Sequence, residues 1–253
     1  AGHQCTVYFY AVRDFTLEEV ARNFAKNYDK VKAEFKYLDG PMDEADAIFA
    51  TGWETAYPVF NDPSDAKRFY FVQDFEPYFY PTGSSYALAE NTYKFGFHGI
   101  TAGKWLAQHL SKEYKMECDS FDFGVDTDHY RLINDEPRNK IMFYARPVTP
   151  RRAFELGVIT LSRFHELCPD VEIIMAGWDV SNYEIHYPYT NLAMLSIAEL
   201  PDVYNQCSAA LVLSTTNLSL LPAELLSCGV IPVVNEGENN RLVVDNEYIE
   251  YSE

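Results

Sequence analysis

The sequence predicts an α/β protein built on parallel sheets and divided into two units of similar size. Short apolar runs of β type alternate with helical stretches along the chain, and this alternation is typical of βαβ units. The series of strands pauses near Pro137 and then restarts. The length of 253 residues suits two compact domains. We therefore expect one domain over 1–136 and a second over 137–253.

Each unit is expected to contain about six strands. In the first unit, apolar runs predict strands at 6–11, 35–38, 47–51, 68–73, 99–101 and 120–123, with helices at 16–27 and 102–110. In the second unit they predict strands at 140–145, 171–176, 192–197, 209–214, 230–234 and 247–251, with helices at 152–168, 200–207 and 222–228. Two Rossmann-like sheets fit this count.

Composition narrows the class of function. The net charge of −18 argues against nucleic acid as a partner and against direct docking on an anionic bilayer, since both need basic patches. The five cysteines are scattered without a C-x-x-C pair, which predicts reduced thiols in a cytosolic protein. The sequence has no run of 18 apolar residues. We expect a cytoplasmic protein that reaches the inner face of the membrane only through partners.

The most informative stretch runs from Ser219 to Val234. Pro222 near its start and Gly229 near its end predict a helix between them that leads into a buried strand. Glu224 then lies in the first turn, close to the unpaired N–H groups and the positive end of the helix dipole. There it either contacts a hydroxylated ligand or only stabilises the helix dipole.

This stretch resembles the donor-sugar motif of GT-B glycosyltransferases of the family-4 type, whose usual form is E-x7-E followed by a small residue, Gly and Pro-Val-Val. Glu224 matches the second Glu of the pair, and Thr216 stands where the first would be. The resemblance implies a fold of two Rossmann-like domains facing a cleft. It also implies a sugar-hydroxyl contact for Glu224 and donor contacts for Thr216, Ser219 and Leu220.

The segment 121–130 resembles the interdomain Gly-Val-Asp signature of the same enzymes. Its residues Asp126, Thr127 and Asp128 also form a D-x-D triplet, which in other glycosyltransferases binds a metal. Because Gly124 and Val125 precede the triplet and it lies between the two strand series, we interpret it as a linker, and a solvated turn is the simpler alternative. We expect no metal and no cofactor other than a nucleotide sugar as co-substrate.

Both ends of the chain resemble interior points of these enzymes. Gly2, His3 and Val7 resemble the entry to the second strand of a GT-B amino-terminal domain, and the chain stops just after a predicted strand. The resemblance implies that the GT-B fold is truncated at both ends. A shortened, divergent fold is the alternative.

Three arginines follow the first strand of the second unit. The seven residues 146–152 contain Arg146, Arg151 and Arg152, although the chain as a whole is acidic. The related enzymes carry two cations here that hold the diphosphate of the donor. Fixed guanidinium groups stabilise the negative charge of a departing nucleoside diphosphate without a metal. The alternative is a solvated helix start.

Two further positions are expected at the donor. Gly177 follows a predicted buried strand and resembles one glycine of the G-x-G turn near the nucleobase, although Asp179 replaces the second. Lys104 begins a helix beside the cleft and is expected to approach the donor phosphates. Ligands of open α/β sheets bind outside the carboxyl ends of the strands, so these loops are expected to converge on one crevice.

The segment 70–81 is dense in rings and carboxylates. Together with 50–57 and 99–106, it resembles WsaF-type rhamnosyltransferases of bacterial cell-surface glycan assembly. The resemblance implies an acceptor side, to which we assign Gln73, Asp74, Glu76, Tyr78 and Tyr80, the two tyrosines stacking on acceptor sugar. An aromatic loop packed against its own domain is the alternative.

The resemblance implies a retaining, metal-independent hexosyltransferase of polysaccharide biosynthesis. The donor is expected to be dTDP-L-rhamnose, and the acceptor a glycan or lipid-linked glycan. Arg146, Arg151, Arg152 and Glu224 are the expected catalytic residues. Two alternatives stay open: a GT-B sugar-nucleotide epimerase, which needs no acceptor, and a non-catalytic fragment that binds nucleotide or glycan.

Overall fold

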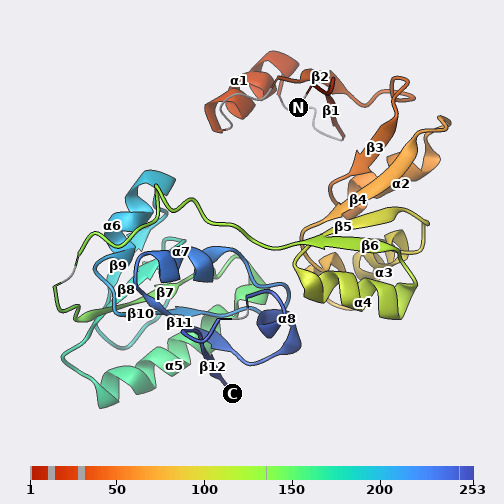
Figure 1. The fold of residues 1–253 in the computed structure, drawn as a ribbon. Helices are drawn as coiled ribbons and strands as arrows, with labels where there is room; N and C mark the ends of the chain where they lie inside the picture. The colour runs from red at the N-terminus through yellow and green to blue at the C-terminus, as the bar shows by residue number, and fades with distance from the viewer. Residues whose placement is uncertain (1, 11–14, 28–31, 135, 245) are drawn as a thin grey trace.

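The strands of the chain form three separate parallel sheets. The computed structural model describes residues 2–10, 15–27, 32–134, 136–244 and 246–253. Within these residues the sheets have two, four and six strands (Figure 1). The predicted α/β class with parallel sheets is therefore confirmed.

The six-stranded sheet belongs to the C-terminal half and has the order β12-β11-β10-β7-β8-β9. Its strands are β7 (Lys140–Tyr144), β8 (Glu172–Ala176), β9 (Thr190–Ala193), β10 (Ala209–Val212), β11 (Ile231–Asn235) and β12 (Glu250–Ser252). Successive residues point to opposite faces, so Met142 and Phe143 belong to different hydrophobic clusters. Helix α5 (Phe154–Leu167) packs on the Phe143 face, and α6 (Leu200–Tyr204) and α7 (Leu221–Ser227) pack on the Met142 face. Burial on both faces explains the continuous apolar runs of these strands.

The four-stranded sheet has the order β3-β4-β5-β6. It is formed by β3 (Ala47–Ala50), β4 (Lys67–Val72), β5 (His98–Ala102) and β6 (Cys118–Phe121), with helices α2 (Trp53–Asn61), α3 (Ser84–Thr92) and α4 (Lys104–Tyr114). Its hydrophobic cluster joins Tyr70 and Val72 of β4 to Leu106 of α4. The other face carries rings stacked across strands, with Phe49 and Phe69 at a centroid distance of 5.0 Å.

The first two strands form a sheet of their own. β1 (Thr6–Phe9) and β2 (Glu34–Tyr37) pair with each other, and α1 (Leu17–Asn27) packs on β2. The strand pattern predicts one sheet for all six early strands, but among the described residues β1 and β2 do not pair with β3. Residue patterns predict that a segment is extended, whereas its partner strand depends on tertiary contacts.

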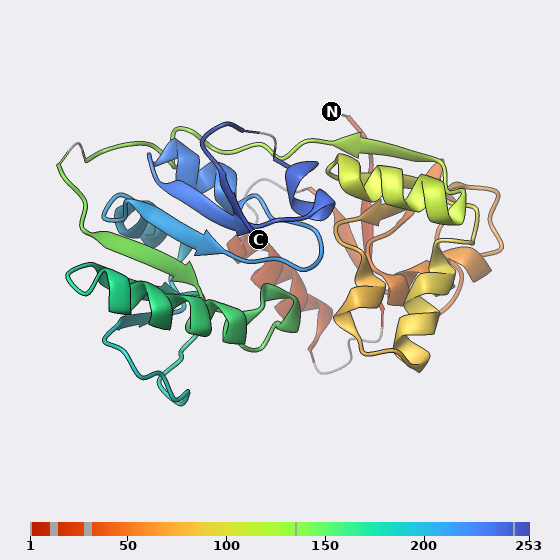
Figure 2. The same ribbon diagram turned by 90° about the horizontal axis from the view of Figure 1, so that it is seen from below.

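The two larger sheets are joined by residues 122–139 and by a packed interface. Trp105 and Phe123 each pack against the cores of both halves. Helix α4 lies beside α8 (Glu238–Arg241) in both views (Figures 1 and 2). Gly103 allows this approach, since a Cβ there would lie 3.2 Å from Val243 and the backbone has φ +89. The boundary predicted near Pro137 falls inside the connection and stays a prediction.

Two parts of the structure differ from the sequence-based expectations. Helices α2 and α3 were not predicted, and α2 contains Pro58, a residue that normally argues against a helix interior. The strand expected at 192–197 ends at Ala193, where the backbone turns to φ 52. A 3₁₀ turn (Ile197–Glu199) follows, capped by reciprocal bonds between Ser196 and Glu199. Local capping therefore ends the extended segment early.

Candidate functional site

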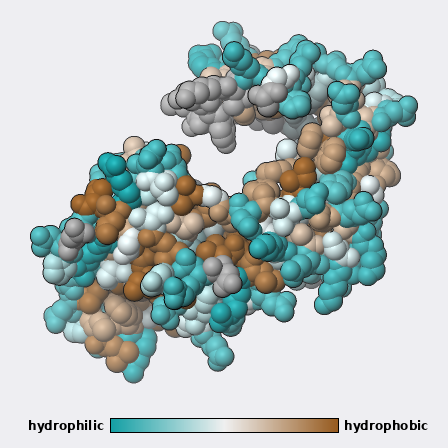
Figure 3. Space-filling model, viewed as in Figure 1, coloured by the Kyte–Doolittle hydropathy of each residue, from teal (hydrophilic) through white to brown (hydrophobic). Residues whose placement is uncertain are grey.

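A cavity of about 330 Å³ lies at the carboxyl ends of the central strands of the six-stranded sheet. The surface of the molecule is hollowed between its two halves (Figure 3). Five residues predicted at the donor site line it: Arg146, Gly177, Ser219, Leu220 and Glu224. Much of the remaining lining is apolar, contributed by Met142, Met194, Leu195, Leu200 and Leu221. The cavity therefore offers an apolar wall with a few polar groups, as small-molecule sites do.

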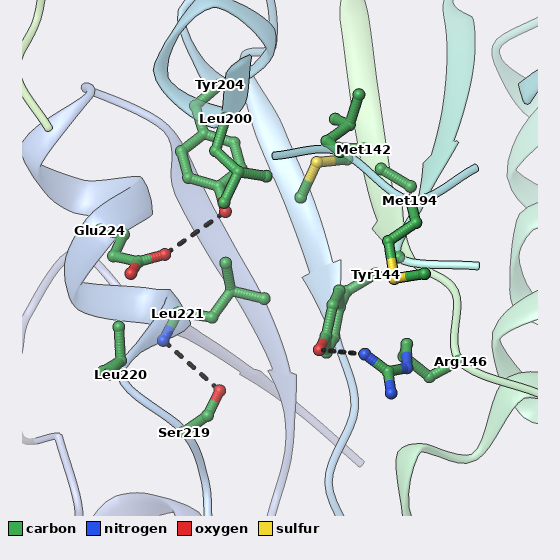
Figure 4. A pocket seen from close by; sticks show the side chains of 13 residues that line it. Met142, Tyr144, Arg146, Met194, Leu200, Tyr204, Ser219, Leu220, Leu221 and Glu224 are labelled. Carbon is green, nitrogen blue, oxygen red and sulfur yellow. Dashed lines mark hydrogen bonds between the residues drawn. The ribbon is translucent and has the colours of Figure 1, made fainter. Parts of the chain in front are cut away.

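Polar groups face each other across this cavity. Tyr204 and Glu224 lie on one side, and Tyr144 and Arg146 lie on the other (Figure 4). The Tyr204 hydroxyl donates to Glu224 Oε2 at 3.4 Å. Arg146 Nη1 donates to the Tyr144 hydroxyl at 3.4 Å. A cation and a carboxylate thus face one apolar space from opposite walls.

Glu224 occupies the first turn of α7, and its exposed fraction is 8%. Pro222 lies near the helix start and Gly229 has φ +70 just beyond the end, as the sequence predicts. Burial raises the pKa of the Glu224 carboxyl, and hydrogen bonding to Tyr130 and Tyr204 opposes the rise. The carboxylate is therefore desolvated and only weakly bonded, so it can accept a hydrogen bond from a ligand hydroxyl.

The three arginines are gathered at the start of α5 but occupy different environments. Arg146 follows β7 and lines the cavity, whereas Arg152 ends a 3₁₀ turn (Pro150–Arg152) and is 9% exposed. Burial lowers the pKa of the Arg152 guanidinium, and neighbouring Arg151 lowers it further. Arg146 Nε and Arg152 Nη1 are buried without a hydrogen-bond partner among the described residues. Unpaired buried donors of this kind are costly and call for an acceptor.

Arg151 contacts the other half of the molecule. Its Nε lies 3.1 Å from Asp74 Oδ2, although the geometry is not that of a hydrogen bond. Its guanidinium also stacks over the Phe79 ring at 4.1 Å. Neither Arg151 nor Arg152 lines the cavity.

Gly177 is required by close packing. Its φ of +118 favours glycine, and a Cβ would lie 3.0 Å from both the Ala145 carbonyl oxygen and the Tyr144 ring. Its N–H donates to the Ala193 carbonyl at 2.8 Å. The glycine therefore keeps the turn after β8 tight against the cavity.

Two predicted donor residues lie away from the cavity. Thr216 is fully buried and its Oγ1 donates to Asp74 Oδ2 at 3.1 Å. Lys104 starts α4 with an exposed side chain, 4.0 Å from Asp122. Their assignment to the donor stays a prediction without a direct contact to the cavity.

The five residues assigned to the acceptor lie around a 3₁₀ turn (Glu76–Phe79) after β4, in three settings. Asp74 is 8% exposed and bonds to the C-terminal half, while Gln73 is exposed and accepts a hydrogen bond from Asn217 at its carbonyl. Tyr78 is exposed and meets Phe75 edge-on, and the Tyr80 hydroxyl accepts from Trp53 Nε1 at 2.9 Å.

The side chain of Glu76 is buried and contacts the first residue of α2, Trp53. Its Oε2 accepts from the Trp53 backbone N–H at 2.7 Å, and its Oε1 accepts from the Tyr70 hydroxyl at 3.2 Å. Each carboxylate oxygen therefore has a hydrogen-bond donor. One of these donors is a backbone N–H at the start of α2, which has no partner within the helix, so Glu76 stabilises a helix of its own half.

Folding stability is expected to depend on pH through Glu76. Burial raises the pKa of this carboxyl from 4.5 to about 7. Because the folded pKa lies above the unfolded one, this group's stabilisation is fully present below the unfolded pKa and is lost as pH rises through about 7. Glu76→Gln keeps an acceptor oxygen but does not titrate. Relative to this variant, the native chain is expected to lose about 2 kcal/mol of unfolding free energy from about pH 5 to about pH 8.

Urea unfolding of both proteins at the two pH values measures this difference. Glu117→Gln, at an exposed position, serves as the matched control. Equal pH dependence in the native chain and Glu76→Gln contradicts the prediction.

The segment 126–130 forms a turn. Asp126 Oδ1 accepts from the backbone N–H of Asp128 at 3.1 Å and of His129 at 3.3 Å. The side chain of Asp126 thus closes a turn within the connection between the two larger sheets, which fits both the linker and the solvated-turn interpretations.

One important residue, Asn217, was not predicted from the sequence. It is buried, and its Nδ2 donates to the carbonyls of Gln73 at 3.0 Å and Ala102 at 2.9 Å. It ties the loop before α7 to the end of the four-stranded sheet. Local sequence carries no signal for it, because an Asn in a loop is typical of any turn.

Two open α/β sheets, joined by an interface and facing a crevice, define the GT-B fold, the fold of a large class of glycosyltransferases. Residues 15–102 match the model of the WsaF N-terminal domain, and residues 139–253 match that of the WsaF C-terminal domain. The chain belongs to the WsaF family.

Three known proteins illustrate what this chain is similar to, one by sequence and two by structure. The O-antigen biosynthesis protein RfbC of Myxococcus xanthus is 38% identical over 202 residues, covering 78% of this chain but 16% of that protein. The chain thus spans about a sixth of the length of this curated relative. HepE of Anabaena, solved with UDP and glucose, matches 99% of this chain and 86% of its own at TM-score 0.68 and 12% identity. Sucrose-phosphate synthase of Thermosynechococcus elongatus matches 81% of this chain and 60% of its own at TM-score 0.65 and 12% identity.

The described helices are also informative about membranes. Among them, none combines the length and the apolar character required to cross a bilayer.

Proposed function

We propose that this chain is the catalytic part of a glycosyltransferase that moves a sugar from a nucleoside-diphosphate donor to a glycan acceptor. One observation carries the proposal: Arg146, which lines a cavity of suitable size, and Arg152, close to it in the chain, each have a buried guanidinium nitrogen without a partner among the described residues. Guanidinium groups match the oxygens of a diphosphate in both charge and geometry. In a chain of net charge −18, such a cationic cluster is a specific feature.

The residues divide into roles by position. Arg146 and Arg152, with Arg151 beside them, stabilise the negative charge of the departing nucleoside diphosphate, and the transfer requires no metal. Glu224, across the cavity, accepts a hydrogen bond from a donor sugar hydroxyl and fixes the sugar. The acceptor glycan approaches from the half that carries Tyr78 and Tyr80. The anomeric configuration is retained.

The proposed donor is dTDP-L-rhamnose, and the proposed process is the synthesis of a cell-surface polysaccharide. The resemblance of segments 50–57, 70–81 and 99–106 to rhamnosyltransferases supports the rhamnosyl donor, and the name of the Myxococcus relative supports the process. The apolar wall of the cavity suits a deoxysugar or the methyl group of thymine. The alternative nucleotide is UDP, which the Anabaena structure contains.

Isothermal titration calorimetry with dTDP, UDP, GDP and ADP tests the donor site. We expect dTDP to bind most tightly and Arg146→Ala to weaken binding by about 10- to 100-fold, because a charged hydrogen bond contributes about 1.5–3 kcal/mol. Arg163→Ala, an exposed position on α5, is the matched control and should bind like the native chain. Absence of binding by all four nucleotides contradicts the proposal.

A product assay separates transfer from the alternative of epimerisation. Incubation with dTDP-L-rhamnose and no acceptor should leave the nucleotide sugar unchanged, whereas an epimerase converts it. Addition of a chelator should leave transfer to acceptor glycan unchanged.

A further inference from the structure

We propose that Asp74, on the acceptor-side half, is a positioning residue that orients the donor diphosphate clamp through Arg151. The inference rests on the proposed function and adds a residue that does not itself contact the donor. It also changes the interpretation of Asp74, whose sequence context predicts a place at the acceptor.

The carboxylate of Asp74 is almost completely enclosed by partners. Oδ2 lies 3.1 Å from Arg151 Nε and accepts from Thr216 Oγ1 at 3.1 Å. Oδ1 accepts from the backbone N–H groups of Asn217 at 3.0 Å and Phe75 at 2.8 Å. With an exposed fraction of 8%, the side chain has little room for an acceptor sugar. Its contacts instead point to the donor half.

Arg151 is held from two directions. The Asp74 carboxylate lies 3.1 Å from its Nε, and its Cζ lies over the Phe79 ring, 4.1 Å from the ring centroid. Among the described residues the Arg151 guanidinium donates no hydrogen bond. Contacts from two directions restrict the orientation of the guanidinium, and its Nη groups, which have no partner among the described residues, stay available to an anion.

The same carboxylate also holds the second loop of the candidate site. Thr216 and Asn217 lie between β10 and α7, and this loop continues through Ser219 into α7, which carries Glu224. Ser219 and Glu224 both line the cavity. Asp74 therefore joins the loop that carries the arginines to the loop that leads to Glu224. Asp74, which belongs to the N-terminal half, thereby fixes the distance between the Arg151 loop and the Thr216–Asn217 loop.

Two roles for Asp74 predict opposite changes in diphosphate affinity when its charge is removed. A carboxylate next to an anion-binding cluster weakens the attraction of the cluster for a diphosphate. Removing the charge should therefore tighten diphosphate binding if Asp74 acts only as a counter-ion. If Asp74 orients Arg151 and the loop, removing the charge should weaken binding instead.

The experiment compares Asp74→Asn, Arg151→Gln and the double variant by calorimetry with dTDP and UDP, and with thymidine and uridine. We expect each single variant to bind the better diphosphate about tenfold more weakly, with nucleoside binding unchanged. The double variant should lose less than the sum of the two single losses, because part of the effect of Asp74 passes through Arg151. Asp119→Asn, an exposed carboxylate beside His98, is the matched control.

Thr216→Val provides a second variant that leaves every charge in place. Removing this partner should weaken diphosphate binding by about threefold, in the same direction as Asp74→Asn. It keeps the test decisive if Asp74→Asn does not fold.

The outcomes are distinguishable. Diphosphate binding that is unchanged or tighter in Asp74→Asn overturns the inference and leaves the proposed function intact. Equal losses for diphosphate and nucleoside, or additive losses in the double variant, also overturn it, because they indicate a general disruption of the interface. A native chain that binds none of the four ligands overturns the proposed function and this inference with it.

Discussion

Glu224→Gln is expected to lower the rate of sugar transfer by about 100-fold while changing the affinity for the nucleoside diphosphate by less than about threefold. The carboxylate lies across the cavity from Arg146, so its proposed partner is a sugar hydroxyl and not the diphosphate (Figure 4). Its desolvated environment strengthens a hydrogen bond to a ligand hydroxyl. Gln has nearly the same shape, so the change tests the charge.

Two controls separate this role from helix stabilisation. Glu238→Gln removes a first-turn carboxylate from α8, outside the cavity, and should retain full transfer. A purely structural Glu224 contributes about 0.3–1 kcal/mol through the helix dipole. If Glu224→Gln loses only this much stability and transfers sugar normally, the carboxylate has no role at the donor.

Gly157→Ala is expected to destabilise the C-terminal half by about 2 kcal/mol, the opposite of what helix propensity predicts. Gly157 lies inside α5, where Ala is normally more favourable by about 1 kcal/mol. A Cβ at this position would overlap the Phe143 ring, with Cε1 at 2.7 Å, and Phe143 is fully buried in β7. The missing side chain allows α5 to pack directly on this ring.

Thermal unfolding of four proteins measures the clash: the native chain, Gly157→Ala, Phe143→Leu and the double variant. The smaller Leu side chain should remove much of the penalty, so the two changes should be strongly non-additive. Ser162→Ala, in the same helix, is the control for propensity alone. A Gly157→Ala variant more stable than the native chain contradicts the prediction.

Much of the fold could be predicted because its signals are local. The strand–helix alternation, the helix at 222–228 and the early position of Glu224 each follow from residues that are neighbours in sequence. The convergence of Arg146, Gly177, Ser219 and Glu224 followed from one general rule about the carboxyl ends of parallel strands.

The rest required distant contacts. Pro58 opposes a helix locally, yet α2 forms with buried Ala56 and Val59 packed in the core of its half. Asp74 was interpreted from its neighbours in an aromatic segment, but its partners Thr216 and Asn217 lie 142 and 143 positions away. Asn217 itself has no local pattern that separates it from an ordinary loop residue.

The sequence by itself determined the α/β class, the helix that carries Glu224 and the loops whose residues line the cavity. These features depend on periodicity, turn chemistry and charge, which act over a few residues. Only the tertiary structure decided which arginines line the cavity, which strands share a sheet, and that Asp74 faces Arg151 of the other half. These features depend on burial and on hydrogen bonds between residues that are far apart in the sequence. Such residues meet only when the chain folds.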